Sequence, residues 1–248
     1  MTRPEPAPQA MVREWRDGDP SLQAAVLAAA IAAQLRAALV RRGAASLVVS
    51  GGRTPLLMFA QLARHALDWT RVHITLADER WVGSDDPASN EGLVRATLLR
   101  GAAAQARFQG LKNAAATPAA GALQAWEALG VLPRPFDVVV LGMGEDGHTA
   151  SLFPGDPQLP AGLDADLPPG CLEMHAPAAP QLRLSLNLSA LLDARRIVIQ
   201  IQGAPKWQVY QRARAAGEEA ELPIRAIFRH STVPLDVYWC PDAGGSAP

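Results

Sequence analysis

The sequence predicts an α/β protein in which helices flank a mostly parallel sheet. Short apolar runs rich in β-branched residues, such as Val138–Leu141, show no alternation with polar residues, which is typical of strands buried on both faces. These runs alternate along the chain with helical patterns, as in α/β folds. Several of them end in glycine-rich turns, and ligands of open α/β sheets bind at such strand ends.

The composition is that of an ordinary globular protein. The 248 residues are 49% hydrophobic and 19% charged, a length that fits one large α/β domain or two small ones. The formal net charge of −1 provides no excess of cations to displace the counterions of nucleic acid. We therefore expect no nucleic-acid partner, and any anion site has to be local.

The ends of the chain and its cysteines predict a cytoplasmic protein. Cys171 and Cys240 have no metal-type spacing, so we expect unpaired thiols in a reducing compartment. We expect no run as long as a membrane span, and residues 1–10 are too polar and proline-rich for a signal peptide. A single domain is expected over residues 11–240, with disordered tails at 1–10 and 241–248. We expect a monomer rather than an oligomer.

The first element is expected to be a long, Ala-rich helix. Asp19 is a good N-cap, and Pro20 suits the first helical position. Apolar residues then recur every fourth position over Leu27–Leu39, and Gly43 ends the pattern.

A buried strand is expected next at Ser46–Val49, followed by the turn SGGRTP. Thr54 is expected to cap a helix over Leu56–Leu67. Free backbone N–H groups at Gly51 and Gly52 and the positive end of that helix would favour a phosphate. A tight connection without a ligand explains this pair of glycines equally well, and the Walker pattern is absent.

The strand expected at Val72–Ala77 ends in three charged residues, Asp78, Glu79 and Arg80. Charged groups at a strand end are costly to bury without a purpose, so this end is either a ligand site or a solvated loop. His73, inside the strand, is expected to be structural. Further helices are expected from Ser89-Asn90 to Leu99 and from Thr117 to Leu129.

The strand Val138–Leu141 runs into GMGEDGH, a turn with three glycines that carries Asp146 and His148. Such a pair offers an orienting carboxylate and a base that titrates near neutrality, so we expect the chemistry here. The letters also match the dinucleotide fingerprint G-x-G-x-x-G. Pro154 and Gly155 leave no room for the crossover helix that this fingerprint requires.

The remainder of the chain begins with an irregular segment, Gly155–Pro180, whose length is typical of lids or functional loops. A strand at Leu182–Leu186 carries Arg183, and another at Ile197–Ile201 ends in a glycine turn with Lys206, a second candidate phosphate contact. Further elements are expected as a short helix capped by Ser189 and ending at Asp193, a helix opened by Pro223 and a closing strand at Leu235–Trp239. Ligand-type groups thus follow four strands, which predicts one shared site with phosphate at one end and histidine with carboxylate at the other.

Five segments together resemble the 6-phosphogluconolactonases: SGGRTP, DERWV, SNEGLVRATLL, GMGEDGHTASLFPG and RLSLN…GAPK, in the family's order over about residues 11 to 240. The resemblance implies a three-layer α/β/α sandwich with a mostly parallel, Rossmann-like sheet of the NagB/RpiA-like type. It also implies hydrolysis of 6-phospho-D-glucono-1,5-lactone to 6-phospho-D-gluconate in the oxidative pentose phosphate pathway, without metal or organic cofactor.

Transferred to this chain, the resemblance makes His148 the general base that takes a proton from the attacking water, with Asp146 orienting the imidazole. Asp78 and Arg80 complete the expected catalytic group. The donor that meets the oxyanion is either the glycine turn or Arg80. The substrate- and phosphate-binding residues implied are Gly51, Gly52, Arg53, Thr54, Gly144, Arg183 and Lys206. Arg53 stands where the family more often has serine.

Three other functions and a zinc site fit the residues less well than lactone hydrolysis. A deaminase of the same scaffold resembles this chain but has an acidic residue after the histidine, where Ser151–Pro154 stands here, and an aromatic residue at the place of Arg80. A non-catalytic sugar-phosphate sensor would usually carry a DNA-reading module, and no such pattern is present. A serine hydrolase would need G-x-S-x-G, and a zinc site from His73, Asp78 and His148 would draw on scattered ligands.

Overall fold

Seven parallel strands form the central sheet of the computed structural model, which describes residues 11–177 and 179–242. In the order in which they lie side by side, the strands are β1 (Val12–Arg16), β10 (Leu235–Cys240), β9 (Ile197–Gln202), β6 (Val138–Leu141), β2 (Ala45–Val49), β3 (Val72–Leu76) and β5 (Arg107–Phe108). Each neighbouring pair is parallel.

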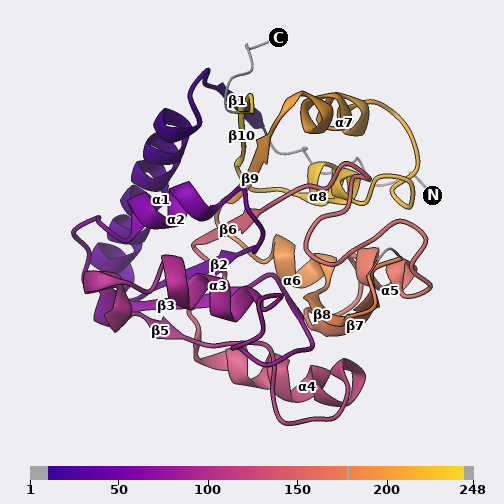
Figure 1. Ribbon diagram of the computed structural model, residues 1–248, viewed down its shortest axis with the longest axis horizontal. Helices are drawn as coiled ribbons and strands as arrows, with labels where there is room; N and C mark the ends of the chain where they lie inside the picture. Colours follow the sequence, from indigo (N-terminus) through magenta and orange to yellow (C-terminus); the bar gives the residue numbers. More distant parts are fainter. Residues whose placement is uncertain (1–10, 178, 243–248) are drawn as a thin grey trace, which may run out of the picture.

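Helices cover both faces of this sheet. The helices of the described residues are α1 (Pro20–Arg42), α2 (Leu56–Leu62), α3 (Asn90–Thr97), α4 (Pro118–Ala128), α5 (Leu159–Leu163), α6 (Leu188–Leu192), α7 (Ala204–Arg214) and α8 (Ile224–His230). Short 3₁₀ helices occupy Trp69–Arg71, Gly101–Gln105 and Leu129–Val131. In Figure 1, α1 and α2 lie on one side of the sheet and α6, α7 and α8 on the other. The predicted α/β/α sandwich with a mostly parallel sheet is confirmed.

The long helix α1 begins and ends where its sequence predicts. The carboxylate of Asp19 accepts a hydrogen bond from the N–H of Ser21 at 2.8 Å, and Gly43 closes the helix in a left-handed conformation with φ 77°. Contrary to the sequence expectation, α1 is long and apolar enough to cross a membrane by length and composition alone. Half of its most apolar window is buried inside the fold, as in a core helix that packs against a sheet.

The central strand β6 is buried along its whole length, which agrees with its unbroken apolar sequence. Asp137, directly before the strand, is also buried, at 3% exposure. Its carboxylate accepts a hydrogen bond from the N–H of Ser46 at 2.9 Å and forms an ion pair with Arg42 at the end of α1. The buried charge is therefore paired, and it ties the start of β6 to β2 and α1.

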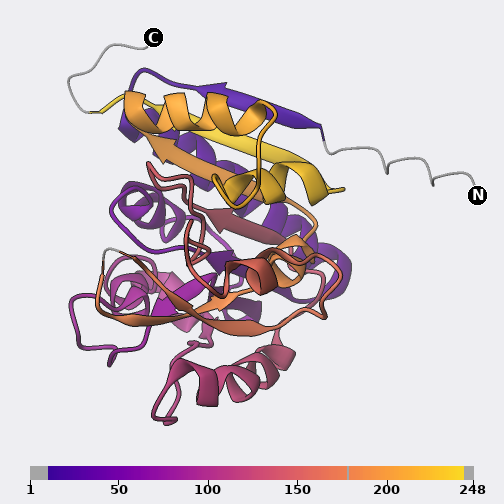
Figure 2. The ribbon, with the colours of Figure 1, turned by 90° about the vertical axis from the view of Figure 1, so that its right-hand side faces the viewer.

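A second, three-stranded antiparallel sheet was not predicted. It consists of β4 (Asp78–Arg80), β8 (Leu182–Leu186) and β7 (Cys171–His175), with β8 in the middle. The segment expected to be an irregular loop from Gly155 to Pro180 therefore contains α5 and β7. α4 packs against β7 and β8, at the opposite end of the molecule from β1 (Figure 2).

Two helix starts differ from the prediction. Thr54 makes no capping hydrogen bond, and α2 ends at Leu62 rather than at Leu67. α6 is capped by Asn187, which accepts from the N–H of Ala190 at 3.0 Å, while the hydroxyl of Ser189 donates to the carbonyl of Leu167, between α5 and β7. The predicted tails at residues 1–10 and 243–248 lie outside the described residues.

Candidate active site

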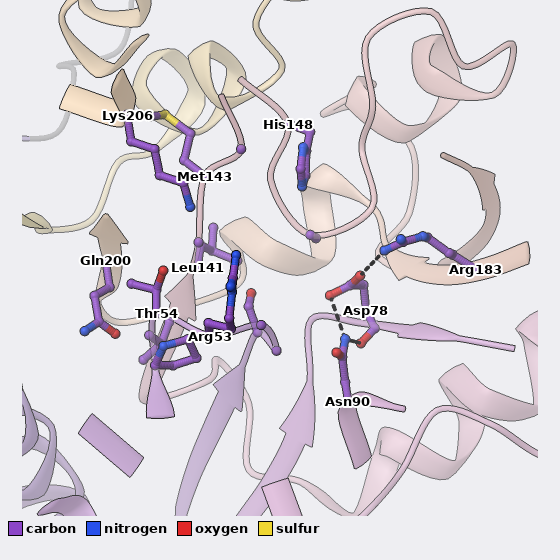
Figure 3. A pocket seen from close by; sticks show the side chains of 18 of the residues that line it. Arg53, Thr54, Asp78, Asn90, Leu141, Met143, His148, Arg183, Gln200 and Lys206 are labelled. Atoms are coloured by element: carbon purple, nitrogen blue, oxygen red, sulfur yellow. Dashed lines mark hydrogen bonds and ion pairs between the residues drawn. The ribbon is translucent and has the colours of Figure 1, made fainter. Parts of the chain in front are cut away.

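A cavity of about 180 Å³ lies where the loops after β2, β6 and β9 meet the small sheet (Figure 3). All of the predicted site residues except Asp146 line it: Gly51, Gly52, Arg53, Thr54, Asp78, Arg80, Gly144, His148, Arg183 and Lys206. The carboxyl ends of parallel strands share one edge of the sheet, so groups far apart in sequence converge there.

His148 is held by its neighbour on the glycine turn. Its Nδ1 lies 2.5 Å from Oδ1 of Asp146, and its backbone N–H donates to the same oxygen at 3.1 Å. Burial acts to raise the pKa of Asp146, but the hydrogen bond and charge of His148 outweigh it, and the pKa is lowered. No described residue bonds Nε2, so this nitrogen is the one available as a base.

Gly144 leaves the space that this pair occupies. A Cβ at position 144 would lie 2.2 Å from Nδ1 of His148 and 2.4 Å from Oδ1 of Asp146. At Gly142, at the start of the turn, a Cβ would meet nothing within 4 Å. The glycine at position 144 is thus required by the Asp–His pair, whereas the one at 142 is not.

The ring of Phe153 connects His148 to the small sheet. It packs on the imidazole with 4.3 Å between ring centroids, and the Cζ atom of Arg183 lies 5.1 Å from the same ring. Phe153 is 6% exposed, so it forms a buried wall between the histidine and the guanidinium.

Asp78 is a buried carboxylate that lines the cavity on the side of the small sheet. It is 5% exposed and accepts a hydrogen bond from the hydroxyl of Ser151 at 2.5 Å. Nη1 of Arg183 lies 3.8 Å from Oδ2 of Asp78, and the side-chain amide of Asn90 donates to the backbone carbonyl of Asp78 at 2.9 Å. The sequence indicated Asn90 only as part of a helix start, because its contact with β4 depends on tertiary structure.

Glu79 faces away from the cavity and serves the fold. Its carboxylate accepts from the N–H groups of Asn90 and Glu91 at 2.7 Å each and from the hydroxyl of Ser89 at 3.0 Å. It therefore caps the positive end of α3. Burial raises its pKa, although these hydrogen bonds oppose the shift. Of the three charged residues at this strand end, only Asp78 and Arg80 line the cavity.

Arg53 and Lys206 form the basic end of the cavity. Neither makes an ion pair with a described residue. Burial lowers the pKa of Lys206, while Glu145 and Asp242 nearby act in the opposite direction. α2 has only seven residues and no side-chain cap, so its dipole contributes little to an anion site here.

The two positions before Arg53 require glycine for different physical reasons. Gly52 has φ 91°, a left-handed conformation that side chains disfavour. A Cβ at Gly51 would lie 1.9 Å from Oδ1 of Asn90. Gly51 is therefore fixed by a neighbouring side chain, which the sequence interpretation as a phosphate loop did not anticipate.

Unsatisfied polar atoms gather around this cavity. Seven buried side-chain atoms in the described residues have no hydrogen-bond partner, and five of these belong to residues that line the cavity. The five are Ser50 Oγ, Arg80 Nε, Asn90 Oδ1, Arg183 Nε and Gln200 Oε1. Native proteins contain few such atoms, so their concentration here indicates a binding site for a polar ligand. Ser50, Asn90 and Gln200 were not predicted.

The chain is similar to known proteins over most of its length. A model of the family described as glucosamine-6-phosphate isomerases/6-phosphogluconolactonase matches residues 18–239. Proteins named 6-phosphogluconolactonase from Rhizobium meliloti and Pseudomonas putida are 47% and 48% identical to the chain. The alignments cover 90% and 94% of this chain and 96% and 94% of those proteins, respectively.

Solved structures agree as well. A crystal structure of a 6-phosphogluconolactonase from Shewanella baltica aligns with a TM-score of 0.88 and 45% identity, covering 94% of this chain and 98% of that one. A monomeric glucosamine-6-phosphate deaminase aligns with a TM-score of 0.75 at 18% identity, which is a similarity of fold alone.

Proposed function

The chain belongs to the family of glucosamine-6-phosphate isomerases and 6-phosphogluconolactonases, and we propose that its cavity hydrolyses 6-phospho-D-glucono-1,5-lactone with His148 as the general base. The names of the relatives at 46–48% identity support lactone hydrolysis as the activity. The observation that carries the residue assignment is the His148–Asp146 pair, 2.5 Å apart. Its imidazole shares one cavity with Arg53 and Lys206, two cations that have no ion-pair partner in the described part of the chain.

The proposed reaction begins with water. Nε2 of His148 accepts a proton from a water molecule as its oxygen attacks C1 of the lactone, and the electron pair of the carbonyl moves to its oxygen. When this oxyanion collapses, the bond from C1 to the ring oxygen breaks, and the imidazolium returns the proton to the ring oxygen. Asp146 stabilises the imidazolium between the two steps, since it lies against Nδ1.

The phosphate is assigned to the opposite end. Arg53 and Lys206, with the turn Gly51–Thr54, provide cations without an ion-pair partner in the described part of the chain. Hydrogen bonds between charged groups and phosphate are of the strong class. This end would hold C6 and its phosphate while C1 lies against His148.

The hydrogen bonds within the glycine turn limit which groups can donate to the oxyanion. The N–H of Gly144 donates to the carbonyl of His148 at 2.9 Å, and that of Gly147 donates to the carbonyl of Gly144 at 3.0 Å. The N–H of His148 is taken by Asp146. Three donors of the turn are thus already used, which favours a guanidinium at the oxyanion.

The deaminase hypothesis finds less support in the site. The residue that follows the histidine motif, Ser151, donates its hydroxyl to Asp78, and Phe153 packs on the imidazole. Neither offers the carboxylate that proton transfer between C1 and C2 would use. The structural similarity to a deaminase, at 18% identity, bears on the fold and not on this choice.

We also propose that the enzyme acts in the cytoplasm as a monomer, without a nucleic-acid or membrane partner. Both cysteines are buried, free thiols, as expected in a reducing compartment. The chain is small and nearly neutral, with a formal net charge of −1, which favours a monomer. Light scattering after gel filtration would test the state of assembly, and a stable dimer would contradict it.

The activity is tested with fresh lactone. Glucose 6-phosphate is oxidised in situ, and the disappearance of the lactone is timed against its spontaneous hydrolysis. We expect acceleration in proportion to enzyme concentration. No acceleration, together with release of ammonia from glucosamine 6-phosphate, would replace the proposal by the deaminase.

A further inference from the structure

We propose that Arg183 binds the negative charge that hydrolysis creates at C1: first the oxyanion, then the carboxylate of the product. This inference rests on the proposed function. The resemblance had placed Arg183 among the phosphate-binding residues, and its surroundings point to the other end of the substrate.

Arg183 lies across the cavity from Lys206. It projects from β8, which pairs with β4 so that Arg183 stands opposite Arg80, and Figure 3 shows it beside Asp78 and on the far side of the cavity from Lys206. Its side chain is 12% exposed. Its guanidinium and the imidazole of His148 share the ring of Phe153, at 5.1 and 4.3 Å. Arg183 thus belongs to the end where C1 reacts.

The charge around Arg183 suits a single negative charge better than a phosphate dianion. Asp78 lies 3.8 Å away, so a dianion bound by Arg183 would meet twice the repulsion from this carboxylate that a monoanion meets. Arg53 and Lys206 have no comparable carboxylate within ion-pair distance among the described residues. The two ends therefore differ in the anion that they favour.

The guanidinium of Arg183 also has N–H groups that make no hydrogen bond within the described residues. Asp78 is the one acidic side chain within ion-pair distance of it among the described residues, and at 3.8 Å it lies beyond hydrogen-bond distance. The Nε of Arg183 is buried and has no hydrogen-bond partner in the described part of the chain. Burial lowers the pKa of Arg183 without removing its charge, since Asp78 opposes the shift. A planar guanidinium with free N–H groups matches the two oxygens of a carboxylate.

The reaction supplies such an anion. Attack of water places an electron pair on the former carbonyl oxygen of C1, and cleavage of the ring C–O bond leaves a carboxylic acid that releases its proton. Both C1 oxygens of the product then share one negative charge. Three N–H groups of the glycine turn, those of Gly144, Gly147 and His148, already donate within the turn and do not meet this charge. A cation that binds the product carboxylate also stabilises the oxyanion that precedes it.

The test compares two ligands that differ only at C1. 6-Phosphogluconate carries a carboxylate there, and glucitol 6-phosphate carries a neutral CH₂OH with the same phosphate and hydroxyls. Dissociation constants are measured by calorimetry for wild type, Arg183→Gln and Lys206→Ala. We expect Arg183→Gln to weaken 6-phosphogluconate about 10- to 100-fold, the range for a hydrogen bond to a charged group. Glucitol 6-phosphate should bind Arg183→Gln nearly as well as wild type.

Lys206→Ala is the matched control, since it should weaken both ligands by the same factor. An equal loss of both ligands in Arg183→Gln would assign Arg183 to the phosphate and overturn the proposal. Unchanged binding of both would overturn it as well.

Two further measurements keep these outcomes interpretable. Arg183→Lys retains the charge but not the planar fork, so its binding of 6-phosphogluconate should lie between wild type and Arg183→Gln; equality with Arg183→Gln would contradict a charge contact. Thermal unfolding identifies a variant that fails to fold. Because calorimetry needs no turnover, a wild type that binds both ligands but does not hydrolyse the lactone would refute the proposed function and leave the test of Arg183 intact.

Discussion

The two ends of the cavity are built differently. The basic end consists of Arg53, in the loop after β2 of the parallel sheet, and Lys206, in the first turn of α7 after β9. These cations have no ion-pair partner in the described residues. The reacting end, with His148, Asp78 and Arg183, joins the turn after β6 to the small antiparallel sheet, and there charges lie beside opposite charges.

This difference indicates a division of work. Unpaired cations attract a permanent dianion and contribute to binding in the ground state and the transition state alike. Groups held in paired networks are fixed in position, which suits the stabilisation of charge that appears only during reaction. Mutations at the basic end should therefore change KM, and those at the reacting end should change kcat.

The largest effect is expected for His148→Ala. Loss of the general base should lower kcat by about 10²–10⁴-fold, with KM nearly unchanged. Steady-state kinetics with in situ lactone would show this, and circular dichroism would confirm that the variant is folded. A variant with near-wild-type kcat would remove His148 from the mechanism.

The second largest effect is expected for Gly144→Ala, which displaces the imidazole of His148 but does not remove it. In Gly144→Ala the new Cβ would lie 2.2 Å from Nδ1 of His148, so the imidazole has to move. A displacement of about 1 Å at a catalytic group can cost about 10²-fold in rate. Gly142→Ala is the matched control, because a Cβ there meets nothing within 4 Å. Equal kcat values for the two variants would contradict the role assigned to the turn.

At the basic end, Lys206→Ala should raise KM about 10- to 100-fold, the range for a hydrogen bond to a charged group, with little change in kcat. Lys206→Arg, which keeps the charge, should recover part of the affinity. A fall in kcat at constant KM would place Lys206 at the reacting end instead.

The pH dependence of binding should report the same lysine. Burial lowers the pKa of Lys206, so its ammonium loses the proton at a lower pH than an ordinary lysine. Affinity for glucitol 6-phosphate is then full below this lowered pKa and falls as the pH rises through it. Lys206→Arg stays charged and should show no such fall. Calorimetry across the alkaline range measures both, and parallel curves would contradict the assignment.

The smallest effect is expected for Arg53→Ala. Arg53 is exposed, and exposed ion pairs contribute about 0.2–1 kcal/mol, so KM should rise less than about fivefold. An effect as large as that of Lys206→Ala would show that the substrate buries Arg53.

The elements that the sequence predicted well are those whose signals are local. β6 is a continuous apolar run, and α1 carries its own cap residues at Asp19 and Gly43, so both could be placed without knowledge of their neighbours. The convergence of strand-end groups on one cavity also followed from the sequence, because parallel strands place their carboxyl ends at one edge.

The small sheet and the edge strand β1 could not be predicted in this way. β4 consists of three charged residues and becomes a strand because β8 supplies its hydrogen-bonding partner. β1 has three charged residues among its five, so it carries no apolar run that would predict a strand. It is fixed by pairing with β10, where Nε of Arg13 donates to Asp236 at 2.8 Å across 223 positions. The same dependence on distant partners explains why Asn90 was missed and why Thr54 was wrongly expected to cap α2.

The most direct test of the divided cavity is one set of kcat and KM values for the lactone, measured in parallel for wild type, His148→Ala and Lys206→Ala. We expect His148→Ala to lower kcat and keep KM, and Lys206→Ala to keep kcat and lose affinity. If both variants changed the same parameter to the same extent, the two ends would not have separate functions.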